Sequence, residues 1–129
     1  MSETPGGFTV IVTDDDELVR KVITIYLSGK GYRVIPTASG QECLEQMSLG
    51  VPDAVLLDVT MPSMDGWEVC RRIREFSTVP VIMLTARAQE SDREIGIAVG
   101  ANAYVTKPVS LKELEAGIRA FIRPPTPTT

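Results

Sequence analysis

The sequence of 129 residues contains no histidine and only two cysteines. Without histidine, the chain cannot use Ser-His or Cys-His catalysis, and it cannot carry a phosphohistidine of its own. Zinc sites are built from several cysteine, histidine or carboxylate ligands, so two cysteines alone do not predict one. Cys43 and Cys70 fall in separate helical patterns, and we interpret both as small apolar residues that are buried or half-buried.

The sequence also lacks a long apolar run and an excess of positive charge. No run approaches the roughly 18 to 20 apolar residues of a membrane span, and the first residues, MSETPGG, have neither the basic start nor the apolar centre of a secretory signal. The net charge of −4 argues against direct binding of nucleic acid or of an anionic membrane, because both favour basic clusters. We therefore expect a cytoplasmic protein whose ligand is a cation or another protein.

What the sequence does contain is an alternation of apolar patterns over the length of one domain. Five short aliphatic runs, at residues 8–12, 32–35, 54–57, 79–84 and 103–105, alternate with helical patterns. Continuous apolar runs indicate strands buried on both faces, which is typical of a parallel sheet covered by helices. We therefore predict a single doubly wound α/β domain, (βα)5, over residues 8–122. Residues 1–7 are expected to form a flexible N-terminus, and the Pro/Thr-rich residues 123–129 a tail or linker.

The helical patterns carry their own start signals and apolar faces. An oxygen-bearing N-cap residue followed three positions later by glutamate marks a helix start. Four such pairs occur: Ser39/Glu42, Asp65/Glu68, Ser91/Glu94 and Ser110/Glu113. Apolar spacing predicts the buried faces as Leu18, Val22 and Ile25; Cys43, Leu44 and Met47; Cys70, Ile73 and Phe76; and Leu111, Leu114, Ile118 and Phe121.

Polar side chains follow several predicted strands, at the end where a doubly wound sheet binds its ligands. Asp14 and Asp15 come after the first strand, Asp58 ends the third, and Thr85 and Lys107 follow the fourth and fifth. Clustered carboxylates raise one another's pKa values unless a cation neutralises them, and oxygen ligands suit Mg²⁺. A nearby lysine adds a second positive charge, which points to a phosphate ligand. Because it alone ends the central apolar run, Asp58 is the candidate nucleophile, with the acidic pair serving the cation.

These motifs together resemble the receiver domain of two-component response regulators. The resemblance rests on the acidic pair after the first strand and on "LLDVTMPSMDG", "MLTA" and "TKP", in this order and spacing, and it extends from about residue 8 to residue 122. It implies a flavodoxin-like fold with strand order 2-1-3-4-5 and helices on both faces of the sheet. It also implies that Asp58 accepts a phosphoryl group from the phosphohistidine of a sensor histidine kinase.

The resemblance further assigns the metal site. Asp15, Asp58 and the backbone carbonyl of Thr60 would hold one Mg²⁺, for which Mn²⁺ is a substitute, and Asp14 would act through water. Thr85 would contact the phosphoryl group as the switch hydroxyl.

The remaining roles that the resemblance implies concern the lysine and the switch. Lys107 would pair with the phosphoryl group, and Pro108 follows it in a pattern that often carries a cis peptide bond. Ala86 meets the need for a small residue beside the site. Tyr104 would turn inward on phosphorylation, so that the surface formed by the fourth helix, fifth strand and fifth helix changes.

The implied function is a signalling switch and not an enzyme, apart from its own phosphorylation and dephosphorylation. Its partners would be a sensor histidine kinase or a histidine phosphotransfer protein, a downstream protein or output domain, and, on phosphorylation, a second copy of the chain. Two alternatives stay open: a phosphate-independent interaction module, and the receiver part of a longer DNA-binding regulator. A dehalogenase-like phosphatase would need an Asp-x-Asp motif followed by threonine after the first strand, where this chain has DDDEL. A flavodoxin-like cofactor binder would need a phosphate-binding loop without carboxylates at the same place.

Overall fold

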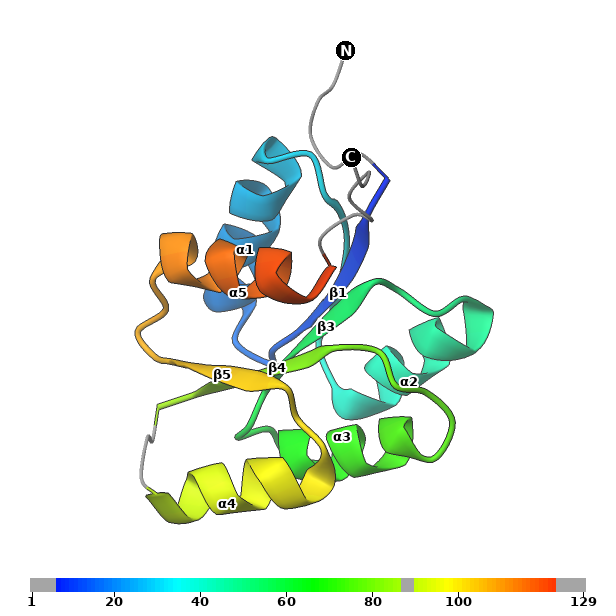
Figure 1. Ribbon diagram of the computed structural model, residues 1–129. Coiled ribbons are helices and arrows are strands. Elements are labelled where there is room, and N and C mark those ends of the chain that lie inside the picture. The colour runs from blue at the N-terminus through cyan, green and yellow to red at the C-terminus, as the bar shows by residue number, and fades with distance from the viewer. Residues whose placement is uncertain (1–6, 87–89, 123–129) are drawn as a thin grey trace, which may run out of the picture.

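The computed structural model describes residues 7–86 and 90–122 as five parallel strands that alternate with five helices (Figure 1). The predicted N-terminal segment up to residue 6 and the Pro/Thr-rich residues 123–129 lie outside this part. The elements are β1 (Thr9–Thr13), α1 (Glu17–Gly29), β2 (Arg33–Thr37), α2 (Gly40–Leu49), β3 (Ala54–Asp58), α3 (Gly66–Arg74), β4 (Val81–Thr85), α4 (Glu90–Val99), β5 (Ala103–Thr106) and α5 (Leu111–Ile122). The sheet order β2-β1-β3-β4-β5 confirms the predicted fold class and strand order.

The sheet has helices on both faces, with α1 and α5 on one side and α2, α3 and α4 on the other (Figure 1). Strands β3 and β4 are buried along their whole length, which explains why their sequences read as continuous apolar runs. The edge strand β2 is partly exposed and contains Pro36, a residue that an edge tolerates because one side of it needs no ladder hydrogen bond.

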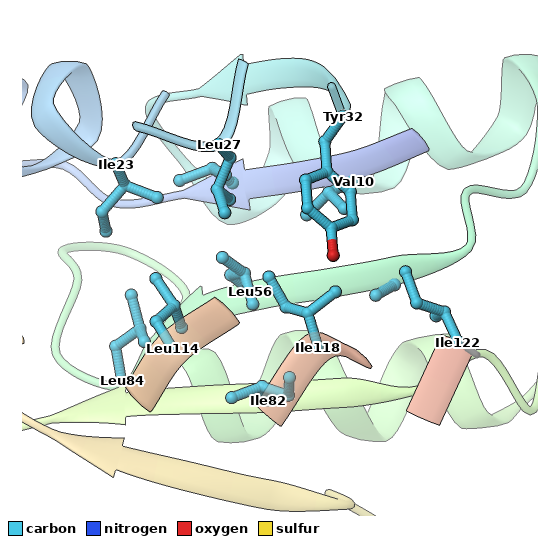
Figure 2. Packing of buried hydrophobic residues seen from close by; sticks show 12 residues of the cluster. Val10, Ile23, Leu27, Tyr32, Leu56, Ile82, Leu84, Leu114, Ile118 and Ile122 are labelled. Carbon is cyan, nitrogen blue, oxygen red and sulfur yellow. The ribbon is translucent and has the colours of Figure 1, made fainter. Parts of the chain in front are cut away.

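Each face of the sheet has its own core cluster. On the α1 and α5 side, Val10 and Leu56 of the sheet pack with Ile23, Leu27 and Ile118 of the helices (Figure 2). The cluster on the other side is formed by alternate strand residues with α2 and α3. Its buried members are Ile11, Cys43, Met47, Val55, Leu57, Met61, Val69, Cys70, Ile73, Val79, Val81 and Met83. Both cysteines are free and buried, as predicted.

The predicted buried face of α1 is wrong. Leu18, Val22 and Ile25 are 69%, 42% and 66% exposed, whereas Ile23 and Leu27 are buried against the sheet. The helix carries two apolar stripes at helical spacing, and spacing alone does not tell which stripe faces the sheet. The packing of α1 against the sheet decides which of the two stripes is buried.

Two aromatic residues predicted to be buried are also exposed. α3 ends at Arg74, so Phe76 lies beyond the helix and is 56% exposed. On α5, Phe121 is 42% exposed, and its neighbour Ile122 is the buried residue. Both errors lie at a helix end, where a difference of one or two residues in the boundary changes the face that a side chain occupies.

The predicted N-caps are confirmed for α2, α3 and α5. Ser39, Asp65 and Ser110 each accept a hydrogen bond from the backbone N–H three residues later, at 3.1, 2.9 and 3.3 Å. α4 begins at Glu90, so Ser91 lies inside the helix and is not its N-cap. The cap of α1 was not predicted: it is Asp16, whose side chain accepts from the N–H groups of Leu18 and Val19.

Candidate functional site

The candidate site lies at the carboxyl ends of the strands, where parallel register aligns distant residues. Thr13 of β1 pairs with Leu57 of β3, so the residues that follow them, Asp14 and Asp58, lie side by side. On the other flank, Asp58 pairs with Leu84 of β4, which places Thr85 one position further along. The sheet therefore brings together side chains that are far apart in the sequence.

Lys107 joins the two buried carboxylates of the site. Its Nζ lies 3.0 Å from Oδ1 of Asp58 and 3.1 Å from Oδ2 of Asp14. Asp14 is fully buried and Asp58 is 4% exposed, so the carboxylate side of both ion pairs is shielded from water, whereas the Lys107 side chain is 22% exposed. The lysine backbone is tied to β4, because its N–H donates to the carbonyl of Thr85 at 2.6 Å, and the Lys107–Pro108 peptide bond is cis.

The three carboxylates of the site form an oxygen-rich cluster. Asp14, Asp15 and Asp58 each offer one carboxylate oxygen, and these oxygens all lie within 4.8 Å of one another. Asp15 is exposed, so the cluster opens to solvent on its side. Mg²⁺ takes one or two carboxylates and keeps several waters, and an all-oxygen donor set with one open side fits these preferences. The donor chemistry of these residues therefore fits the metal that the sequence predicts.

Burial and charge change the acid–base behaviour of the site. Burial is the main reason that the pKa of Asp58 is raised to about 6; the hydrogen bond from Lys107 opposes this rise, and the negative charges of Asp14 and Asp15 add to it. Burial by itself would lower the pKa of Lys107. The hydrogen bonds that it donates to Asp58 and Asp14 outweigh burial and raise that pKa. The lysine therefore stays charged while Asp58 titrates near the physiological range.

The loop after β3 turns closely over the backbone of Asp58. The N–H of Gly66 donates to the carbonyl of Val59 at 2.9 Å. A Cβ added at Gly66 would lie 3.0 Å from the carbonyl carbon of Asp58 and 2.9 Å from Cε of Met83. Only glycine allows this approach, a requirement that the sequence does not reveal. In the same loop Thr60 is exposed at the edge of the site.

The residues predicted to transmit the signal lie on β4, directly after it, and on β5. Thr85 is buried at the end of β4, and Ala86 follows it at an exposed bend. Tyr104 of β5 is half-buried and packs against the core cluster on the side of α2 and α3. A Cβ added at Gly96 of α4 would lie 3.3 Å from Cζ3 of Trp67 and 3.8 Å from Cε2 of Tyr104, so this glycine lies beside both rings. The sequence did not identify Gly96.

One acidic residue of α5 is engaged by side chains of the same chain. Glu115 of α5 is 9% exposed and accepts hydrogen bonds from Arg119 Nε at 2.7 Å and from the Tyr32 hydroxyl at 3.3 Å. It is therefore a packing residue. The surface of α4, β5 and α5 that the resemblance implies would also include Arg87, Glu90 and Arg93, whose side chains lie outside the described residues.

The site also contains a residue that sequence reasoning missed. Arg20 of α1 donates from Nη1 to the backbone carbonyl of Asp14 at 2.7 Å. The N–H of Asp16 donates to Oδ1 of the same aspartate at 2.9 Å. Basic residues in the first turn of a helix usually face solvent, so the sequence contains no signal for this contact.

Among the described residues, no helix combines the length and the apolar character needed to cross a bilayer.

Comparison with known proteins identifies a family. The profile of the response regulator receiver domain matches residues 10–119. The chain is 46% identical over 114 residues to a "Probable transcriptional regulator ycf27" of Guillardia theta, covering 88% of this chain and 45% of that protein. It is 44% identical over 119 residues to "Response regulator MprA" of Mycolicibacterium vanbaalenii, covering 92% and 52%. The chain thus spans about half the length of these relatives. The crystal structure of a putative response regulator from Chloroflexus aurantiacus is 36% identical, with a TM-score of 0.85 over 91% of this chain and 98% of that one.

Proposed function

The chain belongs to the response regulator receiver-domain family of two-component systems, and from that premise we propose that it is a phosphorylation-activated switch whose phosphoacceptor is Asp58. The observation that carries this proposal is the pairing of buried Asp58 with Lys107 Nζ at 3.0 Å. A buried carboxylate beside a fixed cation, at an edge open to solvent, is suited to form an acyl phosphate. The lysine can offset the charge of the three phosphoryl oxygens as they arrive.

In the proposed reaction, a carboxylate oxygen of Asp58 attacks the phosphorus of a phosphohistidine on a partner protein. The new O–P bond forms as the N–P bond breaks, and the electron pair leaves with the histidine nitrogen. The imidazole departs neutral because the ring either already carries a proton on its other nitrogen or takes one from water. When bound, Mg²⁺, or Mn²⁺ in its place, would be held by Asp15, Asp58 and the backbone carbonyl of Thr60, with Asp14 acting through water, and it would supply positive charge for the phosphoryl oxygens. Lys107 orients the Asp58 carboxylate and stabilises its negative charge in a buried position.

The signal is proposed to leave the site through β4 and β5. Thr85 is buried on the strand beside Asp58, close enough in register to turn its hydroxyl toward a new phosphoryl group. Ala86 leaves room next to it, and half-buried Tyr104 on β5 then shifts inward, changing the surface of α4, β5 and α5. Phosphorylation needs only to shift a population between two states that the domain already samples.

The wider role follows from the family. We infer a receiver domain over residues 8–122, followed by a linker or tail at 123–129, that works in the cytoplasm with a sensor histidine kinase or a histidine phosphotransfer protein. The transcriptional regulators that it resembles are about twice as long, which favours a receiver that controls an output domain, on the same chain or on a partner. We also propose that two phosphorylated copies form a homodimer. We propose no enzymatic activity beyond the domain's own phosphorylation and dephosphorylation.

The test is phosphorylation with a small donor. We expect that acetyl phosphate and Mg²⁺ add the mass of one phosphoryl group to the intact protein, and that a metal chelator prevents the gain. Asp58→Asn should abolish the gain, whereas Asp65→Asn, which alters an exposed cap carboxylate, should retain it. The assignment is wrong if the wild type gains no mass or if Asp58→Asn still gains it.

A further inference from the structure

Arg20 forms a hydrogen bond to a backbone carbonyl and not a salt bridge with an acidic side chain of its own helix. It lies in the first turn of α1 and is half-buried, and its Nη1 donates to the backbone carbonyl of Asp14 at 2.7 Å. The side chain thus reaches back across the start of its own helix to the loop that carries the acidic pair. A hydrogen bond from a charged donor to a partly buried carbonyl is among the stronger hydrogen bonds in proteins.

Asp14 is held at four separate atoms by residues of different elements. Its N–H donates to the carbonyl of Thr37 at 3.2 Å, and its Oδ1 accepts from the N–H of Asp16 at 2.9 Å. Its Oδ2 accepts from Lys107 at 3.1 Å, and its carbonyl accepts from Arg20. The first three bonds orient the residue and its carboxylate, whereas the bond from Arg20 acts on the peptide group that leads to the next residue.

That next residue is Asp15, which is exposed. Packing does little to place an exposed carboxylate, so the position of Asp15 depends on the backbone on either side of it. On one side Arg20 holds the peptide group, and on the other Asp16 is fixed as the N-cap of α1. With both sides held, the three carboxylate oxygens of Asp14, Asp15 and Asp58 stay within 4.8 Å of one another.

We propose that Arg20 is a positioning residue for the metal site: it holds the Asp14–Asp15 peptide so that the carboxylates are preorganised for one divalent cation. This inference rests on the proposed function, because it takes the acidic pair as metal ligands. Arg20 acts through the backbone and does not touch the metal. Preorganisation strengthens binding because the ligands need not be ordered at the moment of binding.

Charge and positioning predict opposite effects when Arg20 is removed. A guanidinium near the acidic cluster repels Mg²⁺, so the loss of its charge alone should tighten Mg²⁺ binding. Loss of positioning should weaken Mg²⁺ binding, because the acidic loop then samples arrangements in which the carboxylates diverge. The direction of the change therefore separates a positioning role from a purely electrostatic one.

The experiment is Mg²⁺ titration by isothermal calorimetry on the whole chain, with Arg20→Met, Arg20→Lys and Lys21→Met. Lys21 is the matched control, because it is exposed on the same helix turn and its loss removes the same charge. We expect Arg20→Met to weaken Mg²⁺ binding about tenfold, in line with the loss of one charge-assisted hydrogen bond. Arg20→Lys keeps the positive charge but not the planar guanidinium group, so its Mg²⁺ affinity should lie between those of the wild type and Arg20→Met. Lys21→Met should leave the affinity unchanged or slightly increase it.

A kinetic readout distinguishes positioning from general damage. Phosphorylation of Arg20→Met by acetyl phosphate should need more Mg²⁺ for half-maximal rate, and it should approach the wild-type rate at saturation. Should Arg20→Met fail to fold, as judged by circular dichroism, the same comparison is made with Arg20→Lys. The inference is overturned if the folded Arg20 variants bind Mg²⁺ as tightly as Lys21→Met does. Failure of the wild type to bind Mg²⁺ would instead contradict the proposed function.

Discussion

Asp58→Asn is expected to stabilise the metal-free protein at neutral pH, and the gain should disappear in acid. The pKa of Asp58 is raised from 3.8 to about 6 in the folded protein, mainly by burial. The folded protein therefore holds a proton on Asp58 over a pH range in which the unfolded chain has lost it. By linkage, the contribution of Asp58 to wild-type stability falls as pH rises from about 4 through 6 and then levels off.

The size of this effect follows from the difference between the two pKa values. One pKa unit corresponds to about 1.4 kcal/mol, so ionising Asp58 in the folded state costs about 3 kcal/mol above pH 7. Asparagine has nearly the shape of the neutral carboxyl group and carries no charge. The variant should therefore unfold with a free energy about 3 kcal/mol higher than the wild type at pH 7.5, which corresponds to a rise in Tm of roughly 10 °C. The difference should fall to about half near pH 5 and almost vanish below pH 4.

The assay is urea denaturation followed by circular dichroism, in a metal chelator, at several pH values between 4 and 8. The control is Asp65→Asn, because an exposed N-cap aspartate is replaced well by asparagine and its stability difference should stay small at every pH. Saturating Mg²⁺ should reduce the advantage of Asp58→Asn, since the cation neutralises the wild-type carboxylate. A stability difference that does not change with pH, or an Asp58→Asn variant no more stable than the wild type at pH 7.5, would refute the reasoning.

Four further substitutions test contacts around the site and in the loops and helix ends. Lys107→Met removes the cation shared by two buried carboxylates, so phosphorylation by acetyl phosphate should slow about 100-fold in a mass-based time course. Gly66→Ala places a Cβ 3.0 Å from the carbonyl carbon of the last β3 residue and should lower the free energy of unfolding by about 1 to 3 kcal/mol in urea. Gly100→Ala should lower the free energy of unfolding by about 1 to 3 kcal/mol, because φ of Gly100 is +93° and the new Cβ would lie 2.9 Å from Nε of Arg74. By contrast, Gly29→Ala meets open space at the end of α1 and should raise the free energy of unfolding by about 0.5 to 1 kcal/mol. Equal melting temperatures for Gly100→Ala and Gly29→Ala would contradict both expectations.

Local chemistry explains which parts of the fold were predictable. An N-cap depends on a side chain and the backbone three residues away, so Ser39, Asp65 and Ser110 could be identified from their immediate neighbours. The strands were predictable because two-sided burial requires an uninterrupted apolar run. The missed cap shows the limit of this approach: Asp16 caps α1 without a glutamate at the third position after it.

The errors share a different cause. The exposed stripe of Leu18, Val22 and Ile25 has the same helical spacing as the buried one, and packing of α1 against the sheet selects which stripe is buried. A contact such as that of Arg20 with the Asp14 carbonyl depends on how a helix is oriented at its start. No pattern within a few residues contains that information.

The sequence by itself determined the alternation of strands and helices, the caps of three helices, the family resemblance and the candidate residues at the strand ends. Only the tertiary structure decided that Lys107 bridges Asp14 and Asp58, that burial raises the pKa of Asp58 to about 6, and that Gly66 lies against the Asp58 backbone. Element type follows from interactions among near neighbours, which can be read along the chain. Distances, burial and acidity depend on residues that parallel pairing brings together from positions far apart in the sequence.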